Sequence, residues 1–439
     1  MNYKKLNISL GWLAFLIATI VYFLTVEDTA SLWDCGEYIT AAYKLEVGHP
    51  PGAPLFMLLG RLFSFFAEPD MVGVWINRMS ALSSSLSILF LFWTITLLGK
   101  KIALKDGIEI TRAQQVAILS SGFVGAMAYT FTESFWFSAV EGEVYAMSSL
   151  FTAVIFWATL KWDEENTLIR QGLIQPEGRP LRWMILIMFL FGLAIGVHLL
   201  GLLVLPCIAY IVMFNYRQGK EVSAKLFFLT GILGVFVLAF VQEGIIPGTI
   251  ALASNMEIFF RNSLGLPFVS GAIFFFTVLI SLLIVGLIVT RRKNMPIANT
   301  VILGFVMLFI GYGSFATIVI RSNANPPLDE NNPENLVTLH AYLKREQYGS
   351  WPLLYGEWFN SKQKDQKEWG DRSPFYDKRY VVTTSTGTEV VAFRDKEVAD
   401  NYVANSGKKY TIVHKYFETN KNTREKQVPD YAQKTIFPR

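Results

Sequence analysis

Long apolar stretches alternate with short polar ones over the first three quarters of the chain. A helix that crosses a bilayer needs about 20 mostly apolar residues. The pattern therefore predicts an all-α polytopic membrane protein with about nine transmembrane helices. The predicted spans, each nearly free of charge, are 8–26, 79–99, 113–131, 144–162, 183–197, 199–216, 226–242, 268–290 and 298–320.

Residues 183–216 are too few for two full crossings with a loop, and they are long for one. Basic residues, which prefer the cytoplasmic side, flank both ends of this stretch. The stretch is therefore predicted to form a short hairpin with His198 near its outer tip. The flanking residues are Arg179, Arg182, Arg217 and Lys220.

Lys and Arg are distributed unequally between alternate loops. With the N-terminus inside, most of them fall in cytoplasmic segments. This asymmetry predicts a cytoplasmic N-terminus and, after nine spans, an extracytoplasmic C-terminal region. The predicted external loops between the spans carry only Lys44, Arg61, Arg78 and Arg261.

The last part of the chain, 321–439, is polar and mixed in charge, unlike the apolar region 1–320. Residues 380–393 predict a β-hairpin around Gly387, and 409–417 predict another strand. We therefore expect a transmembrane domain over 1–320 and a small α+β extracytoplasmic region over 321–439. The chain ends without an obvious stop signal, so this region is expected to be truncated or part of a larger one.

Composition narrows the possible classes. Hydrophobic residues make up 52% of the chain and charged residues 17%, which excludes a disordered or collagen-like protein. Two cysteines exclude a disulfide framework, and no Cys/His cluster has the spacing of structural zinc. We expect no nucleic-acid partner. The predicted spans contain almost no ionisable residue, which argues against the buried proton relays of transporters.

Acidic residues gather instead in the first external loop, 27–73. If 34–44 is helical, Asp34 and Glu37 share one face, one turn apart. Asp34 could then cap backbone amides at the helix start. The neighbouring aromatics Trp33 and Tyr38 favour a second interpretation, in which a carboxylate at the membrane surface is a general base for a hydroxyl.

The same loop contains the sequence His49-Pro50-Pro51-Gly52, which predicts a stiff turn. Whether His49 also touches a substrate stays open at this point. A histidine at an external membrane surface can hydrogen-bond a phosphate or orient a carboxylate.

Three further positions have both a structural and a functional interpretation. Glu141 and Glu143, with Tyr145, lie at the start of the fourth predicted span, where the helix dipole alone favours carboxylates; they could equally line the same cavity as Asp34. His198 is either an ordinary interfacial histidine or a substrate contact. Arg321 follows the last span and either snorkels to the interface or binds a lipid-linked phosphate.

Four sequence segments together resemble a known family: WDCGEYITAA, GHPPGAPLFMLLGRL, SAVEGEVYAMSSLF and GLAIGVHLLGLLVLP. They are similar to a bacterial family of polytopic membrane proteins catalogued as a domain of unknown function. That family has an animal relative, a protein O-mannosyltransferase, and both are placed in the GT-C glycosyltransferase superfamily. The resemblance covers about 8–350, and no motif in 351–439 matches.

The resemblance implies a GT-C-like fold in the bacterial cytoplasmic (inner) membrane. It also implies an inverting transfer of mannose or a similar sugar from a polyprenyl-phosphate donor to an acceptor hydroxyl on the external face. Asp34 would be the base, and Glu37 would orient the acceptor or the donor. Fixed positive or donor groups should await the leaving phosphate. The positions expected at the substrates are His49, Pro50, Pro51, Gly52, Glu141, Glu143, Tyr145, His198 and Arg321.

The expected partners are the lipid-linked sugar, the bilayer and a secreted or membrane protein that offers a Ser/Thr hydroxyl. No cofactor is certain: two neighbouring carboxylates could hold a divalent cation, but no complete ligand set is visible. Two alternatives are kept. The number of spans would also suit a transporter or flippase of lipid-linked substrates, and the external C-terminal region would suit a scaffold for envelope assembly.

Overall fold

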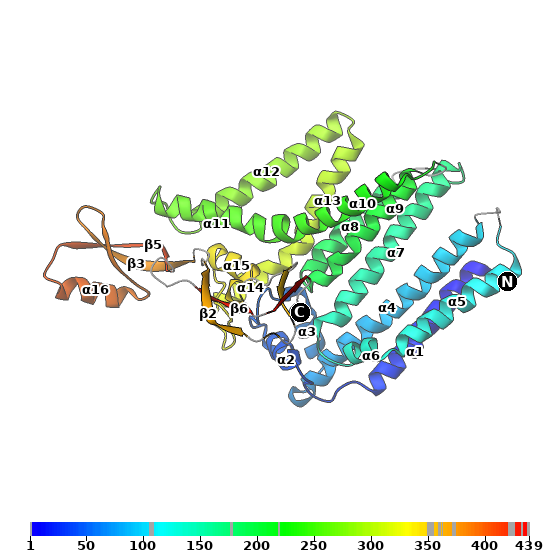
Figure 1. Ribbon diagram of the computed structural model, residues 1–439, viewed down its shortest axis with the longest axis horizontal. Helices are drawn as coiled ribbons and strands as arrows, with labels where there is room; N and C mark the ends of the chain where they lie inside the picture. The colour runs from blue at the N-terminus through cyan, green and yellow to red at the C-terminus, as the bar shows by residue number, and fades with distance from the viewer. Residues whose placement is uncertain are drawn as a thin grey trace. The chain divides into compact units, whose positions relative to one another are not determined.

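The computed structural model is mostly helical, with short strands towards the C-terminus (Figure 1). Two compact units divide the chain. Unit 1 comprises 1–245 and 280–330, and unit 2 comprises 246–279 and 331–439. The residues described are 2–104, 109–175, 179–217, 220–348, 355–358, 361, 363–370, 375–419, 426–431 and 433–436.

Unit 1 is built from long helices joined by short ones. The long helices are α1 (Tyr3–Leu24), α4 (Val72–Ala103), α5 (Arg112–Thr130), α7 (Val144–Arg170), α8 (Arg179–Ile195), α9 (Leu205–Tyr216), α10 (Ala224–Ala239) and α13 (Pro296–Tyr312). The shorter elements are α2 (Cys35–Lys44), α3 (Pro54–Ser64), η1 (Pro69–Met71), α6 (Glu133–Ala139), η3 (Leu199–Val204), η4 (Phe240–Ile245), η5 (Gly313–Phe315) and α14 (Ala316–Ser322). Helix α12 (Ser270–Arg292) is divided between the two units.

Among the described residues, seven helical segments are long and apolar enough to cross a membrane, and each coincides with one of the nine predicted spans. The polytopic helical class is therefore confirmed. The other two predicted spans, 113–131 and 183–197, are helices as well, but they do not meet the same criteria of length and hydropathy. Helix α8 is shorter, and α5 is less apolar because its first turn contains Arg112, Gln114 and Gln115. The predicted break in 183–216 falls at His198, between α8 and η3.

Helix α4 lies beside α1, α5 and α7 (Figure 1). Small residues bring these helices close together: a side chain at Gly122 of α5 would collide with Thr96 of α4. Aromatic and aliphatic side chains such as Tyr22, Phe92 and Phe135 fill the interior between them. Tight packing at small residues is the usual way in which membrane helices associate.

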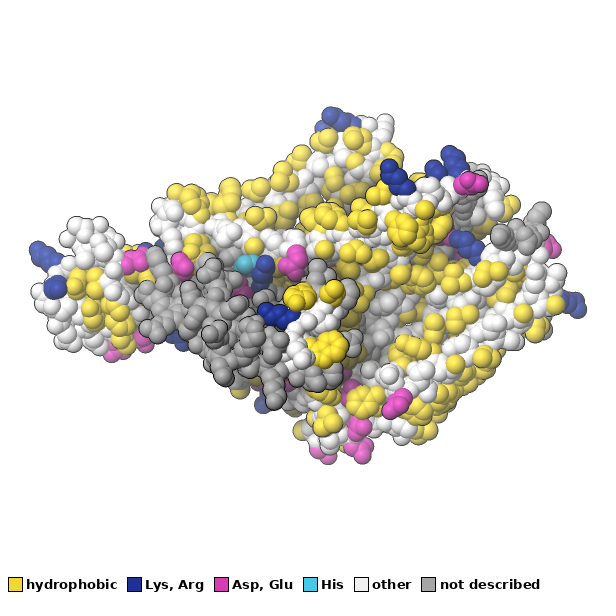
Figure 2. Space-filling view, in the orientation of Figure 1, with side chains coloured by type: hydrophobic (Ala, Val, Ile, Leu, Met, Phe, Trp, Pro, Cys, Tyr) yellow, Lys and Arg dark blue, Asp and Glu magenta, His cyan; other side chains and the backbone are white. Residues whose placement is uncertain are grey.

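The two ends of this bundle differ in charge. At one end, Lys100 and Lys101 of α4 pair with Glu164 and Asp163 of α7. At the other end, the loop after α1 meets the loop before α7. The N–H of Glu27 in the first loop donates to the carbonyl oxygen of Val140 in the second. Figure 2 shows Lys and Arg side chains at the helix ends near α9, and several Asp and Glu side chains at the lower edge, near α6.

Unit 2 joins helices to small antiparallel sheets, and its strands lie in the C-terminal region in which the sequence predicted them. The predicted hairpin is β3 (Tyr376–Thr384) with β4 (Glu389–Phe393), turning at Gly387 with a φ of 82°. Strand β5 (Tyr410–Glu418) pairs with the other edge of β3 and gives the strand order β4-β3-β5. The other elements are α11 (Ile246–Asn262), α15 (Leu336–Leu343), η6 (Glu346–Tyr348), α16 (Lys396–Asn405), and the strand pairs β1 (Tyr355–Glu357) with β7 (Lys434–Ile436) and β2 (Gln363–Gly370) with β6 (Lys426–Tyr431).

Side chains of α11 attach this helix to its neighbours within unit 2. The buried carboxylate of Glu257 accepts hydrogen bonds from the N–H groups of Val269, Gly271 and Ala272 at the start of α12. The amide of Asn262 bonds to both backbone groups of Tyr416 in β5. Glu257 thus satisfies amides that a helix start leaves unpaired.

Candidate active site

Helix α2 presents the two predicted catalytic carboxylates. It begins at Cys35, so Asp34 is the flanking N-cap residue and Glu37 lies in the first turn. The side chain of Asp34 makes no capping hydrogen bond, and 56% of it is exposed. The capping interpretation of Asp34 is therefore wrong. Its carboxylate is far more exposed than that of Glu37, whose side chain is 23% exposed.

Glu37 is engaged with His49. Its Oε1 accepts a hydrogen bond from the backbone N–H of His49 at 2.6 Å, and the ring Nδ1 lies 3.0 Å from Oε1 and 3.1 Å from Oε2. The other ring nitrogen, Nε2, lies 3.9 Å from Oδ2 of Asp34. His49 therefore stands between the two carboxylates.

This contact changes the protonation of both partners. The hydrogen bond to Glu37 raises the pKa of His49 above its usual value against the opposing effect of burial, and the charges of Glu37, Asp34 and Glu330 add to the rise. Burial alone would raise the pKa of Glu37, but the hydrogen bonds and charge of His49 lower it below its usual value. The pair therefore favours an imidazolium facing a carboxylate.

The turn after α2 has the predicted form. The N–H of Gly52 donates to the carbonyl oxygen of His49 at 2.9 Å, and Gly52 has a φ of 73°, which favours glycine. The peptide bond between Pro50 and Pro51 is cis. The structure thus confirms the turn and gives the prolines a role in its shape. A direct contact between these residues and a substrate stays a prediction.

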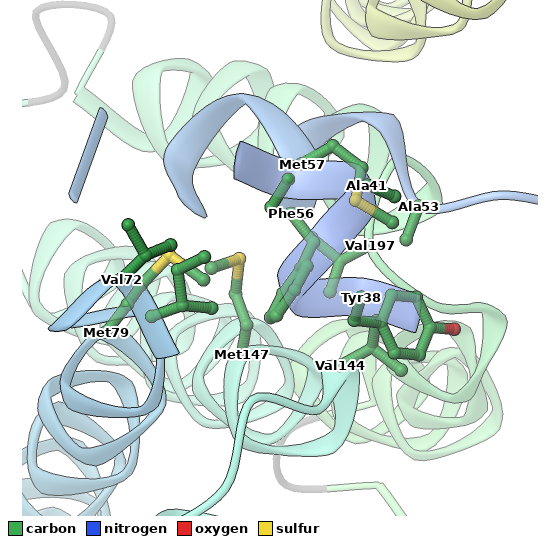
Figure 3. Close-up of a cluster of buried hydrophobic side chains, with 12 residues drawn as sticks. Tyr38, Ala41, Ala53, Phe56, Met57, Val72, Met79, Val144, Met147 and Val197 are labelled. Carbon is green, nitrogen blue, oxygen red and sulfur yellow. The ribbon is translucent and has the colours of Figure 1, made fainter. Parts of the chain in front are cut away.

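A buried apolar cluster holds α2 and the turn in place (Figure 3). The ring of Tyr38 packs edge-to-face on His49 and on Phe56 of α3, with centroid distances of 5.6 and 5.4 Å. Met147 of α7 and Val197, just after α8, close the cluster. Val72 and Met79 of α4 belong to it as well, so helices from three distant parts of the chain support α2 and the turn.

Glu143 is buried at the start of α7, where its carboxylate accepts a hydrogen bond from the N–H of Val144. Burial raises the pKa of Glu143 to about 7, and the nearby charges of Asp34 and Glu141 add to the rise. Glu143 thus caps the start of α7, and its role towards a substrate stays a prediction. The charge of Asp34 contributes to the raised pKa of Glu143. The first loop and the loop before α7 are also joined by the hydrogen bond from Ser31 to Glu141.

Glu141 belongs to a small cluster next to α2. The hydroxyl of Ser31 donates to Oε2 of Glu141 at 2.7 Å and lies 3.0 Å from the sulfur of Cys35. Burial raises the pKa of Cys35 to about 12, so its thiol is protonated at neutral pH. Glu141 therefore reaches the neighbourhood of Asp34 through Ser31 and Cys35.

Tyr145 and His198 lie together, with ring centroids 5.5 Å apart. Nδ1 of His198 accepts a hydrogen bond from the N–H of Leu200 at the start of η3. Burial raises the pKa of Tyr38, and the charges of Glu143, Asp34 and Glu37 and the hydroxyl of Tyr145 contribute. Tyr145 thus places its ring beside His198, in the first turn of the helix that Glu143 caps.

Arg321 occupies the other end of α2. Its guanidinium donates from Nε to the carbonyl oxygen of Leu45 at 2.5 Å and from Nη2 to that of Lys44 at 3.3 Å. A ten-residue helix is about 15 Å long, so these contacts are one helix length from Asp34. The structure thus separates Arg321 from the other candidates and gives it carbonyl partners at the C-terminus of α2.

Sequence reasoning missed two sets of residues that build the site. Asn77 of α4 is fully buried and donates to the carbonyl oxygens of Glu27 and Thr29, which fixes the acidic loop to the bundle. The segment 328–330 runs beside Val47 in a short parallel bridge. Asn77 next to an apolar stretch is a signal that could have been noticed, whereas the pairing of 328–330 left none.

Asp34, Glu37 and His49 also have the donor atoms of a cation site. One ligand atom from each lies within 4.8 Å of the others. Carboxylates and an imidazole suit several divalent metals. An ion held by all three would have to replace part of the contact between Glu37 and His49.

Apolar helices with a carboxylate–histidine cluster at the acidic end of the bundle define a multi-pass membrane protein with a candidate active site at one membrane surface. The family model of the Protein O-mannosyl-transferase TMEM260 N-terminal domain matches 34–222. That range begins at Asp34 and contains every candidate residue except Arg321.

Two curated relatives agree with this match. The chain is 28% identical to the protein O-mannosyl-transferase tmem260 of Dictyostelium discoideum over 54% of this chain, and 26% identical to the mouse protein O-mannosyl-transferase TMEM260 over 47%. It spans only 28% and 26% of the length of these relatives. No solved structure matches the chain. The chain is thus related to these proteins, which confirms the predicted relationship to a protein O-mannosyltransferase.

Proposed function

We propose that this protein is an inverting GT-C-type glycosyltransferase. It moves mannose or a similar sugar from a polyprenyl-phosphate donor to a Ser/Thr hydroxyl of a secreted or membrane protein. The observation that carries this proposal is the exposed Asp34 carboxylate, 3.9 Å from His49, at the acidic end of an apolar helix bundle. The names of the curated relatives support the transfer to protein.

The reaction needs a base on one side of the sugar and a leaving group on the other. Asp34 accepts the proton of the acceptor hydroxyl while the oxygen of that hydroxyl bonds to C1 of the sugar. The bond between C1 and the phosphate oxygen breaks on the opposite face, and its electron pair goes to the phosphate. Attack opposite the leaving group inverts the anomeric centre, as in inverting glycoside hydrolysis.

The charges around Asp34 suit this chemistry. The leaving phosphate gains negative charge, which a nearby cation stabilises. His49, with its raised pKa, provides positive charge beside Asp34, and Tyr145 and His198 offer further polar groups nearby. Glu143, whose pKa is about 7, is substantially protonated at neutral pH and so adds less negative charge where a phosphate must bind.

The proposed setting is the bacterial cytoplasmic (inner) membrane, with the N-terminus in the cytoplasm. The basic end of the helix bundle then faces the cytoplasm, and the site faces outwards. Residues 1–320 carry the reaction, and 321–439 belong to the extracytoplasmic side. This arrangement matches the substrates, because a polyprenyl tail stays in the bilayer while its phosphate lies at the surface.

The test is sugar transfer by the purified protein in lipid vesicles, with polyprenyl-phosphate [3H]mannose as donor and secreted proteins as acceptors. Replacing a general base costs about 10²- to 10⁴-fold in rate, so Asp34→Asn should lose at least that much. Asp28→Asn, an exposed carboxylate in the same loop, is the matched control and should keep wild-type activity. Equal activity of the two variants would remove Asp34 from the mechanism.

A further inference from the structure

Within the described residues, the hydrogen bonds of Glu37 all go to one residue, His49. Both of its carboxylate oxygens contact the ring Nδ1 of His49, and Oε1 also accepts the backbone N–H of the same residue at 2.6 Å. These contacts fix the imidazole by its backbone and by one edge of its ring. Tyr38 packs against the ring at a centroid distance of 5.6 Å. Only 19% of the His49 side chain is exposed.

Gly48 makes this approach possible. A Cβ at this position would collide with Oε1 of Glu37. The backbone of Gly48 does not have the positive φ that favours glycine. A Cβ there would therefore act through space alone, by displacing the carboxylate of Glu37. Gly36, the residue before Glu37, differs: among the described residues its added Cβ would meet only the methyl group of Ala30, at an ordinary 3.7 Å.

We propose that Glu37 and Gly48 act together as positioning residues that hold the imidazole of His49 against Asp34. Glu37 binds His49 and not the sugar, the phosphate or the acceptor. The spacing of 3.9 Å between Nε2 of His49 and Oδ2 of Asp34 is the geometry that this pair sets. The inference rests on the proposed function, because it assigns these residues to the reaction through Asp34.

The site chemistry explains why such positioning matters. A displacement of a reacting group by about 1 Å can cost about 10²-fold in rate. Asp34 is exposed and lacks a capping bond, so its own helix does not orient the carboxylate. A histidine ring held from two sides gives the carboxylate a fixed neighbour. The carboxylate of Glu37 thus plays the part of the third group that orients a histidine in many enzymes.

Gly48→Ala is the sharpest test, because it leaves Asp34, Glu37 and His49 chemically intact. We expect kcat to fall about 10²-fold, with a KM for polyprenyl-phosphate mannose near the wild-type value. The kcat of Glu37→Ala should fall by a similar factor. The double variant Gly48→Ala/Glu37→Ala should be no worse than either single variant, because both remove the same contact. Glu37→Gln, which keeps one acceptor oxygen, should lose less than Glu37→Ala.

The control is Gly36→Ala, which adds the same methyl group one residue from Glu37 and should transfer sugar like the wild type. Thermal unfolding of each variant separates a lost contact from lost folding. An active wild type with Gly48→Ala at full activity would overturn the positioning role and leave the proposed function standing. A rise in donor KM with unchanged kcat in Glu37→Ala would also overturn it, because Glu37 would then bind the donor.

A second readout does not depend on sugar transfer. Diethyl pyrocarbonate modifies histidine rings, and peptide mass spectrometry can follow His49 separately from His198, His340 and His414. Release of Nδ1 from Glu37 should speed the modification of His49 in Gly48→Ala and in Glu37→Ala, but not in Gly36→Ala. Equal rates in all of these proteins would overturn the inference, whether or not the wild type transfers sugar.

Discussion

The guanidinium of Arg321 donates a hydrogen bond from Nε to the carbonyl oxygen of Leu45, at 2.5 Å and across 276 positions of sequence. The contact connects the end of α14 to the C-terminal end of α2, where the helix leaves carbonyl oxygens unpaired and carries partial negative charge. A cation there stabilises the helix that presents Asp34. Arg321 can therefore matter to the site without touching a substrate.

Arg321→Ala is expected to lower the free energy of unfolding by about 1.5–3 kcal/mol, the usual contribution of hydrogen bonds to a charged group. Arg321→Lys should recover part of this loss, because lysine restores the charge but not the fork of donors. Thermal unfolding in detergent measures both. A variant with unchanged stability and a raised KM for polyprenyl-phosphate mannose would instead assign Arg321 to the phosphate, one of the two interpretations that the sequence left open.

Glu143 should make the stability of the protein depend on pH. Its pKa is about 7 in the folded protein, against 4.5 for the free group, so the folded state holds the proton more tightly than the unfolded chain. The free energy of unfolding should therefore fall as pH rises from about 4.5 through 7, by at most about 3 kcal/mol. Glu143→Gln keeps an acceptor for Val144 and cannot ionise.

Thermal unfolding at pH 5 and pH 8 tests this expectation. The wild type should lose more stability between the two values than Glu143→Gln, and the variant should be the more stable protein at pH 8. Parallel pH profiles for the two proteins would mean that Glu143 is ionised in the folded state across this range.

The contact between α8 and α13 depends on two glycines that touch backbone to backbone. An added Cβ at Gly192 would collide with the carbonyl oxygen of Leu308, and one at Gly311 would lie 2.6 Å from the backbone nitrogen of Leu193. Backbone cannot move aside as a flexible side chain can. Gly311→Ala should therefore lower the free energy of unfolding by about 2 kcal/mol or more, the middle of the range for overpacking.

Gly313→Ala is the matched control for this variant. Gly313 lies two residues further along, and no atom of the described residues lies within 4 Å of the position that its Cβ would take. Its backbone is helical, so alanine should be neutral or stabilise the protein by up to about 1 kcal/mol. Chemical or thermal unfolding of the pair gives the difference directly; equal stabilities would show that α8 and α13 do not pack in this way.

Much of the local structure could be predicted from the sequence. The apolar stretches gave the long helices because helices that cross a bilayer must satisfy their own backbone hydrogen bonds. The turn at Gly52 and the hairpin at Gly387 followed from residues that tolerate positive φ. A helix over 34–44 was only assumed from the sequence, and the structure places one at Cys35–Lys44, with no capping bond from the side chain of Asp34.

The candidate site was found only in part. Sequence motifs indicated the two carboxylates and His49 as site residues, and the structure brings these three side chains together. The bond of Glu37 to His49 was not foreseen, because a spacing of 12 residues does not fix which side chain a carboxylate meets after a turn. The collision that keeps Gly48 a glycine was invisible for the same reason.

The sequence by itself determined the membrane-spanning class, the position of the acidic loop and the residue types that could carry out a transfer. These properties depend on local periodicity, composition and charge. Only the tertiary structure decided which of those residues meet: His49 between Glu37 and Asp34, Tyr145 beside His198, and Arg321 at the far end of α2. Such contacts join segments far apart in the chain, and they arise from packing of whole helices, which no short stretch of sequence specifies.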